Sequence, residues 1–217
     1  MFNNDYIMRM IEQLVWGIAK IMHLKQENRQ EEATDLVTDT LRKFFGLNDR
    51  TVEELPWENL MSIVSLGGAP DPERCALLAQ LIKEKADLTN MQGKQAESAG
   101  LYCKALNMLL TAVLADDMLA SGTNTQYIED ILARASGWEL PEDSKPLLFQ
   151  YYEFAGRYGK AEDMLYEILK AANQEDAIEK GEAFYRRLML LPDAELLQGG
   201  LPRDEVMEGY RKITGMK

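Results

Sequence analysis

The side chains that could act as a nucleophile or carry a proton at neutral pH are few in this chain of 217 residues, which has one histidine and two cysteines. His23 lies near the end of an apolar helical pattern and has no second histidine to share a metal site. Cys75 and Cys103 lie beside apolar residues, and neither has a base nearby in sequence to activate the thiol. We therefore expect His23 to be a helix-end or partly buried residue and both cysteines to be buried free thiols. A disulfide between neighbouring helices is the alternative.

Carboxylates are abundant, but their spacing matches no catalytic or metal-binding motif. Adjacent acidic residues occur, for example, at 31–32, 53–54, 116–117, 162–163 and 175–176. Di-iron sites in helical bundles use Glu-x-x-His motifs, and the sequence contains none. Glycine-rich phosphate-binding loops are also absent. Solvated helix faces explain these pairs, so we predict no catalytic residue, no metal, no cofactor and a non-enzymatic protein.

Composition narrows the choice of partner. The chain is 46% hydrophobic and 28% charged, with a net charge of -12 and a pI near 4.7. Because no Lys/Arg stripe is present, nucleic acid and anionic membranes are unfavourable partners. The N-terminal segment lacks the pattern of a signal peptide, and no apolar run approaches the roughly 20 residues of a membrane span. These features, with the free thiols, favour a cytoplasmic protein.

The stretch 147–169 shows the clearest helical organisation. Apolar residues recur at intervals of three and four on both sides of a turn that begins at Gly156. The order of Gly156, Tyr158, Ala161 and Leu165 resembles the turn and second helix of a tetratricopeptide (TPR) unit. An ordinary αα-hairpin is the alternative interpretation.

The rest of the chain is also predicted to be helical, with about ten helices and no β alternation. One helix is expected from about 30 to 45, stopping at Gly46, and a shorter one from Pro56 towards Gly67. Asp71 followed by Pro72 marks another helix start. Only a short turn is expected after Asp193.

Similar segments recur along the chain at an almost constant interval. Hairpin turns are predicted to begin at residues 28, 93 and 156, which are 65 and 63 residues apart. A second marker, glycine followed by proline, recurs at 67–70, 137–141 and 199–202. We therefore predict a single all-α domain over 1–217, a TPR-like helical-repeat fold (α-α superhelix). Its three repeats of roughly 64 residues are expected at 4–67, 71–137 and 143–200, with a C-terminal capping helix at 201–217.

One feature departs from a regular TPR array. The middle of each first helix usually carries a small residue, but this chain has Ile21, Ala86 and Phe149 there. Only Ala86 fits the pattern. Helix packing is therefore expected to be looser or differently angled than in a regular array.

Four segments resemble those of a bacterial protein family of unknown function. They lie at 5–12 (DYIMRMIE), 72–74, 156–162 and 199–203, and the resemblance extends over essentially the whole chain. It implies an all-helical, TPR-like cytoplasmic protein. It implies no activity, ligand or functional residue.

These observations lead to the hypothesis of an interaction module that binds a protein or peptide. By analogy with TPR geometry, the binding groove is expected to involve Lys83, Asp87, Asn90, Gln150 and Glu153. The alternative is a small-molecule-sensing or regulatory protein with a pocket between helices, near the aromatic cluster of Phe149, Tyr151, Tyr152, Phe154, Tyr158 and Tyr166.

Two further expectations concern apolar surfaces. The aromatic cluster is expected to fill the core; alternatively, some of its rings line a peptide groove with Arg157 or the pair Arg186 and Arg187. The apolar stripe from Ile7 to Met22 on the first helix is wide enough to pair with a second copy, which would give a homodimer.

Overall fold

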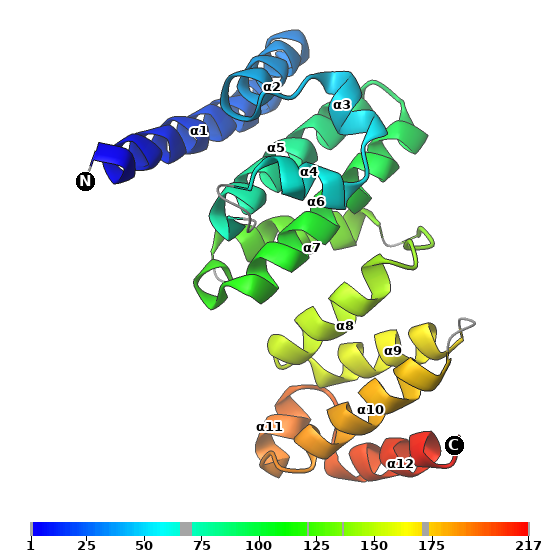
Figure 1. The fold of residues 1–217 in the computed structure, drawn as a ribbon. Helices are drawn as coiled ribbons and strands as arrows, with labels where there is room; N and C mark the ends of the chain where they lie inside the picture. The colour runs from blue at the N-terminus through cyan, green and yellow to red at the C-terminus, as the bar shows by residue number, and fades with distance from the viewer. Residues whose placement is uncertain (1, 66–70, 121, 136, 171–173, 217) are drawn as a thin grey trace. The chain divides into compact units, whose positions relative to one another are not determined.

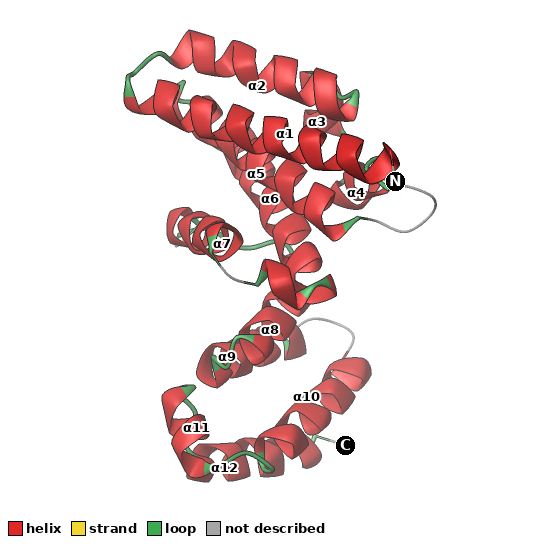
Figure 2. Cartoon of the chain, turned by 90° about the vertical axis from the view of Figure 1, so that its left-hand side faces the viewer, coloured by secondary structure: helices red, strands yellow, loops and turns green. Residues whose placement is uncertain are grey.

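The computed structural model describes residues 2–65, 71–120, 122–135, 137–170 and 174–216, and the side chains of 2–7 and 174 are excluded from the description. Every regular element within these residues is a helix, and no strand occurs among them (Figures 1 and 2). The predicted all-α class is confirmed. The chain divides into two compact units, Met1–Glu139 and Leu140–Lys217, which we call unit 1 and unit 2.

Unit 1 contains seven α-helices in its described residues, together with a short 3₁₀ turn at Asp117–Leu119. The helices are α1 (Phe2–Gln26), α2 (Gln30–Phe45), α3 (Asp49–Glu54), α4 (Trp57–Ile63), α5 (Pro72–Met91), α6 (Gln95–Ala115) and α7 (Thr123–Arg134). The antiparallel pair α5 and α6 forms the centre of unit 1 (Figure 1). The hairpin of α1 and α2 packs on α5, and α7 packs on both α5 and α6. The core therefore lies along α5 and α6, where Leu78, Leu81, Ile82, Leu106 and Met108 are fully buried.

Helix α6 is long and apolar enough to cross a membrane by length and composition alone. No membrane-length run was expected from the sequence, so this property was missed. However, 61% of its most apolar window is buried inside the structure. Its position and burial are those of the core helix of a folded unit.

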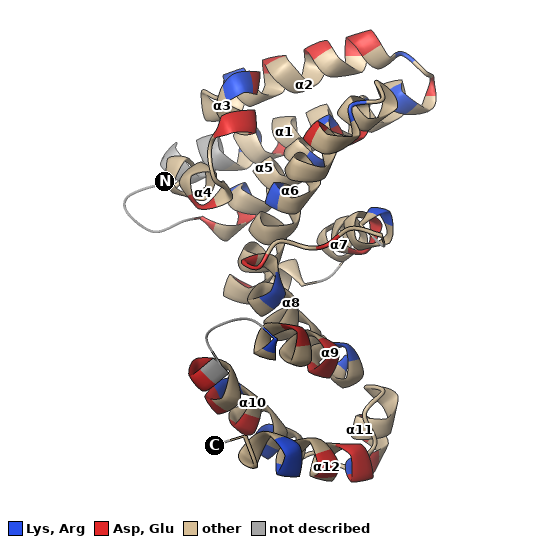
Figure 3. Cartoon of the chain, turned by 90° about the vertical axis from the view of Figure 1, so that its right-hand side faces the viewer, with Lys and Arg blue, Asp and Glu red and all other residues tan. Residues whose placement is uncertain are grey.

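Unit 2 is built from α8 (Ser144–Phe154), α9 (Tyr158–Leu169), α10 (Gln174–Leu188), α11 (Asp193–Gln198) and α12 (Arg203–Thr214). Helices α8 and α9 form a hairpin, α10 packs against α9 and α12, and α11 contacts α12. The aromatic rings of Phe184 and Tyr185 on α10 are fully buried. Charged residues of both signs are distributed along the helices of unit 2 (Figure 3).

The three predicted hairpin turns share one backbone geometry. Asn28, Gly93 and Gly156 all have positive φ, at 58°, 79° and 68°. The residue after each has φ between -87° and -98° and ψ between 62° and 67°. In each turn this next residue donates its N–H to the carbonyl five residues earlier, as in a Schellman helix end. The small residue that follows each turn is fully buried: Ala33, Ser98 and Ala161.

The α8–α9 turn in unit 2 also makes a close main-chain contact. The Gly159 N–H donates to the carbonyl oxygen of Gly199, at 3.0 Å, where α11 ends. A Cβ added to Gly199 would lie 2.6 Å from the Gly156 carbonyl oxygen and 2.2 Å from a ring carbon of Tyr158. Only glycine fits at this position without a shift of the backbone.

The structure corrects the predicted helix boundaries in three places. The six-residue helices α3 and α11 were missed, and each buries a single residue, Val52 and Leu196 respectively, which leaves no apolar period to detect. Helix α4 ends at Ile63, before the predicted stop. The glycines at 67–68 and the marker at 67–70 lie outside the described residues.

Candidate functional site

Unit 1 contains an ionic network in its interior, which we call the charged cluster. It gathers side chains from α1, α5, α6 and α7: Lys25, Lys83, Glu84, Asp87, Tyr102, Tyr127, Asp130 and Arg134. The three members from α5 are at most 7% exposed. Charged groups are rarely buried unless they are paired, so these side chains must neutralise and hydrogen-bond one another.

Asp87 is at the centre of the charged cluster. Its carboxylate accepts hydrogen bonds from the Tyr102 hydroxyl at 2.5 Å, from the Lys83 ammonium at 3.1 Å, and from Lys25. Arg134 lies 3.6 Å away. Burial opposes ionisation of Asp87, but Lys25 and Lys83 outweigh it and hold the pKa of this carboxyl below its usual value.

Lys83 connects α5 to α7. Its ammonium lies 2.5 Å from Asp130 and 5.1 Å from the centre of the Tyr127 ring. Burial would lower its pKa, but Glu84, Asp87 and Asp130 together raise it. Burial also disfavours the charged form of Asp130, yet Lys83 keeps the pKa of Asp130 lowered. Lys83, Asp87 and Asp130 therefore remain charged throughout the neutral range.

Glu84 is fully buried, and Lys25 donates to one of its oxygens. The other oxygen has no hydrogen-bond partner, although the Lys83 ammonium lies 3.6 Å away. Burial and the Glu84 carboxylate raise the pKa of the neighbouring Tyr127. The charged cluster thus contains firmly ionised groups and protonated phenols, which suits a structural network better than proton transfer.

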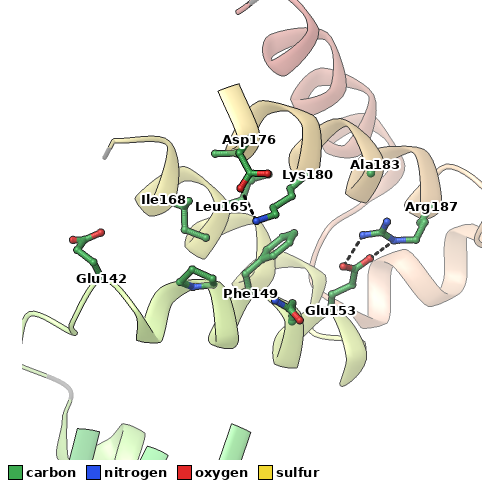
Figure 4. Close-up of a pocket in the computed structure, with 12 residues that line it drawn as sticks. Glu142, Phe149, Glu153, Leu165, Ile168, Asp176, Lys180, Ala183 and Arg187 are labelled. Carbon is green, nitrogen blue, oxygen red and sulfur yellow. Dashed lines mark hydrogen bonds and ion pairs between the residues drawn. The ribbon is translucent and has the colours of Figure 1, made fainter. Parts of the chain in front are cut away.

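Unit 2 contains a different kind of site, a cavity of about 380 Å³ that we call the α8–α10 groove (Figure 4). Its apolar lining comes from three helices, α8, α9 and α10: Pro146, Phe149, Leu165, Ile168, Ala177 and Ala183. Phe149 packs edge-on against Phe184, with ring centres 5.3 Å apart. This contact fixes the orientation of the largest ring in the lining.

Charged side chains surround this apolar lining. Arg187 makes two hydrogen bonds to the Glu153 carboxylate, at 2.7 and 2.9 Å (Figure 4). Lys180 lies 2.6 Å from Asp176. The hydrogen bonds that Arg187 donates to the Glu153 carboxylate raise the pKa of Arg187, against a smaller opposing effect of burial. The Arg187 side chain is still 55% exposed, so its guanidinium can also meet a ligand.

The five residues predicted for a groove fall into three settings. Lys83 and Asp87 lie inside the charged cluster, where they bind each other. Asn90 is exposed at the end of α5. Gln150 and Glu153 both line the α8–α10 groove. Lys25, Tyr102, Asp130 and Arg134 were not predicted to lie around Asp87. The sequence feature that could have indicated such a cluster is the charged segment 83–87 in the middle of a largely apolar helix.

The aromatic and reactive residues can also be placed. Most of the aromatic cluster fills the core, as expected: Phe149, Tyr151, Tyr152 and Tyr158 are at most 8% exposed, whereas Phe154 is exposed. Phe149 and Arg187 also line the groove. His23 lies in the last turn of α1, as expected for a helix-end residue, and its side chain is 67% exposed and lies 3.4 Å from Glu27.

Both cysteines are free thiols, which rules out the alternative disulfide. Cys75 is fully buried, and burial raises its pKa to about 11, whereas Cys103 is half-buried. Among the described residues, no group of three or more His, Cys, Asp or Glu side chains is arranged to hold a metal ion.

The fold defines an all-helical protein composed of helical hairpins. Over residues 1–217 the chain matches the family described as "Family of unknown function (DUF6483)", and it belongs to that family. No curated protein and no solved structure matches it.

Proposed function

We propose that this protein is a non-enzymatic, TPR-like helical-repeat module that binds an amphipathic peptide segment of a partner protein in the α8–α10 groove. The observation that carries the proposal is the combination of a preformed apolar lining with charged residues around it. Peptide-binding grooves use apolar pockets for affinity and surrounding polar groups for orientation.

The hairpin turns support the repeat part of the proposal. Three turns with equivalent backbone angles each join two helices, α1 to α2, α5 to α6 and α8 to α9, and a further helix follows each pair. The residues at equivalent positions after each turn are buried: Val37 and Leu41, Tyr102 and Leu106, Leu165 and Leu169. Stacked repeats of this kind present extended surfaces to ligands.

The charges around the groove favour a peptide with groups of both signs. Glu153 and Asp176 are acidic, and Arg187 and Lys180 are basic. Each basic residue is already paired with an acidic one, so a ligand exchanges one exposed ion pair for another at little cost. The net charge of -12 makes nucleic acid an unfavourable ligand and fits a cytoplasmic partner protein.

A blocked groove tests this proposal. Amphipathic helical peptides with apolar residues at i, i+3, i+4 and i+7 are screened by fluorescence anisotropy against the wild type and Ala183→Arg. Ala183 is half-buried in the groove wall, so the new side chain occupies the cavity. We expect binding peptides to lose roughly tenfold or more in affinity.

Ala194→Arg is the matched control because Ala194 is exposed on α11 and does not line the groove. It should bind the same peptides as the wild type. Equal affinity of the wild type and Ala183→Arg, or the absence of any binding peptide, would contradict the proposal.

One observation favours a second candidate, a small-molecule sensor. The groove volume of about 380 Å³ lies within the range of roughly 300–1,000 Å³ that is typical of ligand pockets. A metabolite that raises the melting temperature of the wild type and Ala194→Arg, but not of Ala183→Arg, would support this alternative.

A further inference from the structure

Helix α1 carries a partly exposed apolar stripe, one end of which contacts its own unit: the Tyr127 hydroxyl of α7 donates to the Met22 sulfur at 3.5 Å. Along this stripe Met8 is 61% exposed, Val15 50% and Met22 41%, and Ile11 and Ala19 lie between them at half-buried and exposed positions. Large apolar side chains at this exposure commonly mark an interaction surface when they are contiguous. The side chain of Ile7, where the predicted stripe began, lies outside the description.

The stripe has a symmetric spacing. Its residues are separated by three, four, four and three positions, which reads the same in both directions about Val15. A spacing of three and four keeps side chains on one face of a helix and forms the contact seam of paired helices. An antiparallel copy of α1 therefore matches this stripe in register.

Side-chain sizes are complementary in that register. Val15 meets Val15 of the second copy, Met8 meets Met22, and Ile11 meets the small Ala19. Pairing large with small residues lets two helices interdigitate. A parallel copy would instead place Ile11 against Ile11 and leave Ala19 against Ala19.

Charges on one flank of the stripe fit the same direction. Glu12 and His23 are exposed, and both lie about 60–80° around α1 from Val15, in opposite halves of the stripe. An antiparallel copy related by a two-fold axis brings this flank against itself with the ends exchanged, so the Glu12 carboxylate approaches the half of the second helix that carries His23. The Lys20 ammonium lies over the Trp16 ring, away from the stripe.

We propose that the stripe formed by Met8, Ile11, Val15, Ala19 and Met22 is the interface of a two-fold symmetric homodimer in which the α1 helices of two copies pair antiparallel. A two-fold interface uses the same patch on both subunits, so each residue contact occurs twice and Val15 lies at the axis. The α8–α10 groove does not include the stripe, so the dimer and peptide binding are separate properties.

The first test is the mass of the full chain in solution, measured by light scattering and sedimentation across a dilution series. The wild type is expected to be a dimer. Val15→Arg places an unpaired charge at the two-fold axis and should raise the dissociation constant by roughly 100-fold or more. The circular dichroism melt of monomeric Val15→Arg should resemble that of diluted, dissociated wild type, because Val15 is half exposed in one copy.

Trp16→Arg is the matched control. Trp16 is 65% exposed and lies about 100° around α1 from Val15, on the side where the Lys20 ammonium lies over its ring. This variant should remain dimeric. A monomeric wild type at all concentrations, or a Val15→Arg variant as dimeric as the wild type, would overturn the proposal and leave the stripe to another partner.

Cysteine cross-linking tests the antiparallel direction. Under mild oxidation Val15→Cys should form a disulfide with itself, and a mixture of Met8→Cys and Met22→Cys should form the mixed dimer. Met8→Cys alone should not cross-link, since its two copies lie at opposite ends of the interface. Efficient self-cross-linking of Met8→Cys would show a parallel pair and overturn the proposed geometry.

Discussion

The charged cluster and the α8–α10 groove use similar side chains but expose them very differently. In the cluster, the side chains of Lys83 and Asp87 are 9% and 6% exposed, and each binds several charged or phenolic partners. Around the groove, the side chains of Arg187 and Glu153 are 55% and 20% exposed and bind mainly each other. Buried ion pairs fix one arrangement because breaking them leaves a desolvated charge, whereas exposed pairs can exchange partners. The cluster is thus suited to holding helices together and the groove to meeting a ligand.

Removal of the central carboxylate should give the largest effect. Asp87→Ala removes the carboxylate that accepts from Lys25, Lys83 and Tyr102 in the interior of unit 1. We expect unit 1 to lose about 3–5 kcal/mol of unfolding free energy. Urea denaturation followed by tryptophan fluorescence measures this, because all three tryptophans, at 16, 57 and 138, lie in unit 1.

The matched control is Glu97→Ala, which removes an exposed partner of Lys94. Its cost should stay within about 1 kcal/mol. If Asp87→Ala were as mild as this control, the contrast between buried and exposed pairs would be wrong for this protein.

Backbone packing in unit 2 should give the next largest effect. Gly199→Ala forces a methyl group against the Gly156 carbonyl and the Tyr158 ring, so we expect a loss of about 1–3 kcal/mol in unit 2. Hydrogen exchange of α8 and α9 should become faster, with tryptophan fluorescence of unit 1 unchanged.

Gly100→Ala serves as the comparison, because nothing lies within 4 Å of the added methyl group in the exposed part of α6. It should stabilise unit 1 by about 0.5–1 kcal/mol. A Gly199→Ala variant with native exchange rates would show that unit 2 does not depend on this main-chain contact.

The two units should also respond differently to acid. Burial raises the pKa of Glu162 in unit 2, more than the hydrogen bond from Tyr185 lowers it. A raised pKa means that the folded unit binds the proton more tightly, so unit 2 should lose stability as the pH rises from the ordinary glutamate pKa of about 4.3 through the folded value. Hydrogen exchange of α9 and α10 at several pH values measures this, and Glu162→Gln should reduce the dependence.

Asp87 in unit 1 has the opposite sign. Because its folded pKa is lowered, its contribution to stability is present above the ordinary aspartate pKa of about 3.9 and is lost as the pH falls through the folded value. Tryptophan fluorescence should therefore show no loss of unit 1 stability through protonation of Asp87 until the pH falls below about 4. Parallel acid responses of the two units would contradict the assigned directions.

The smallest change in stability should come from the groove. Arg187→Ala removes an exposed ion pair with Glu153, so unit 2 should change by less than about 1 kcal/mol. Affinity for any peptide identified in the anisotropy screen should nevertheless fall, with the hydrogen exchange of unit 2 preserved. Unchanged affinity would restrict binding to the apolar lining.

Local signals in the sequence predicted most of the helices. Gly46 and the Asp71–Pro72 start are at the predicted helix ends, and the turns at 28, 93 and 156 are where the repeat spacing placed them. These features depend on neighbouring residues, through helix caps and left-handed turn positions. Short helices such as α3 lack the apolar period that such reasoning requires.

The candidate sites were less predictable, because their contacts join distant parts of the chain. Lys25 and Asp87 are 62 positions apart, and Arg187 and Glu153 are 34 apart. Spacing identified Gln150 and Glu153 as neighbours on one helix face, but it could not identify the basic residue opposite them. It also could not show that Lys83 is buried, since a lysine in a helix usually extends its ammonium into solvent.

The hydrogen bond between the turns at Gly159 and Gly199 has a consequence for the order in which the protein folds during synthesis. Gly159 in the α8–α9 turn leaves the ribosome 40 residues before Gly199, the residue whose carbonyl oxygen accepts its N–H. Until then, the main-chain groups of this turn face water or chaperones. The contacts of the charged cluster, by contrast, all lie within the first 139 residues. Ribosome-bound chains halted before residue 199 should therefore show a protected unit 1 and a protease-sensitive α8–α9 turn.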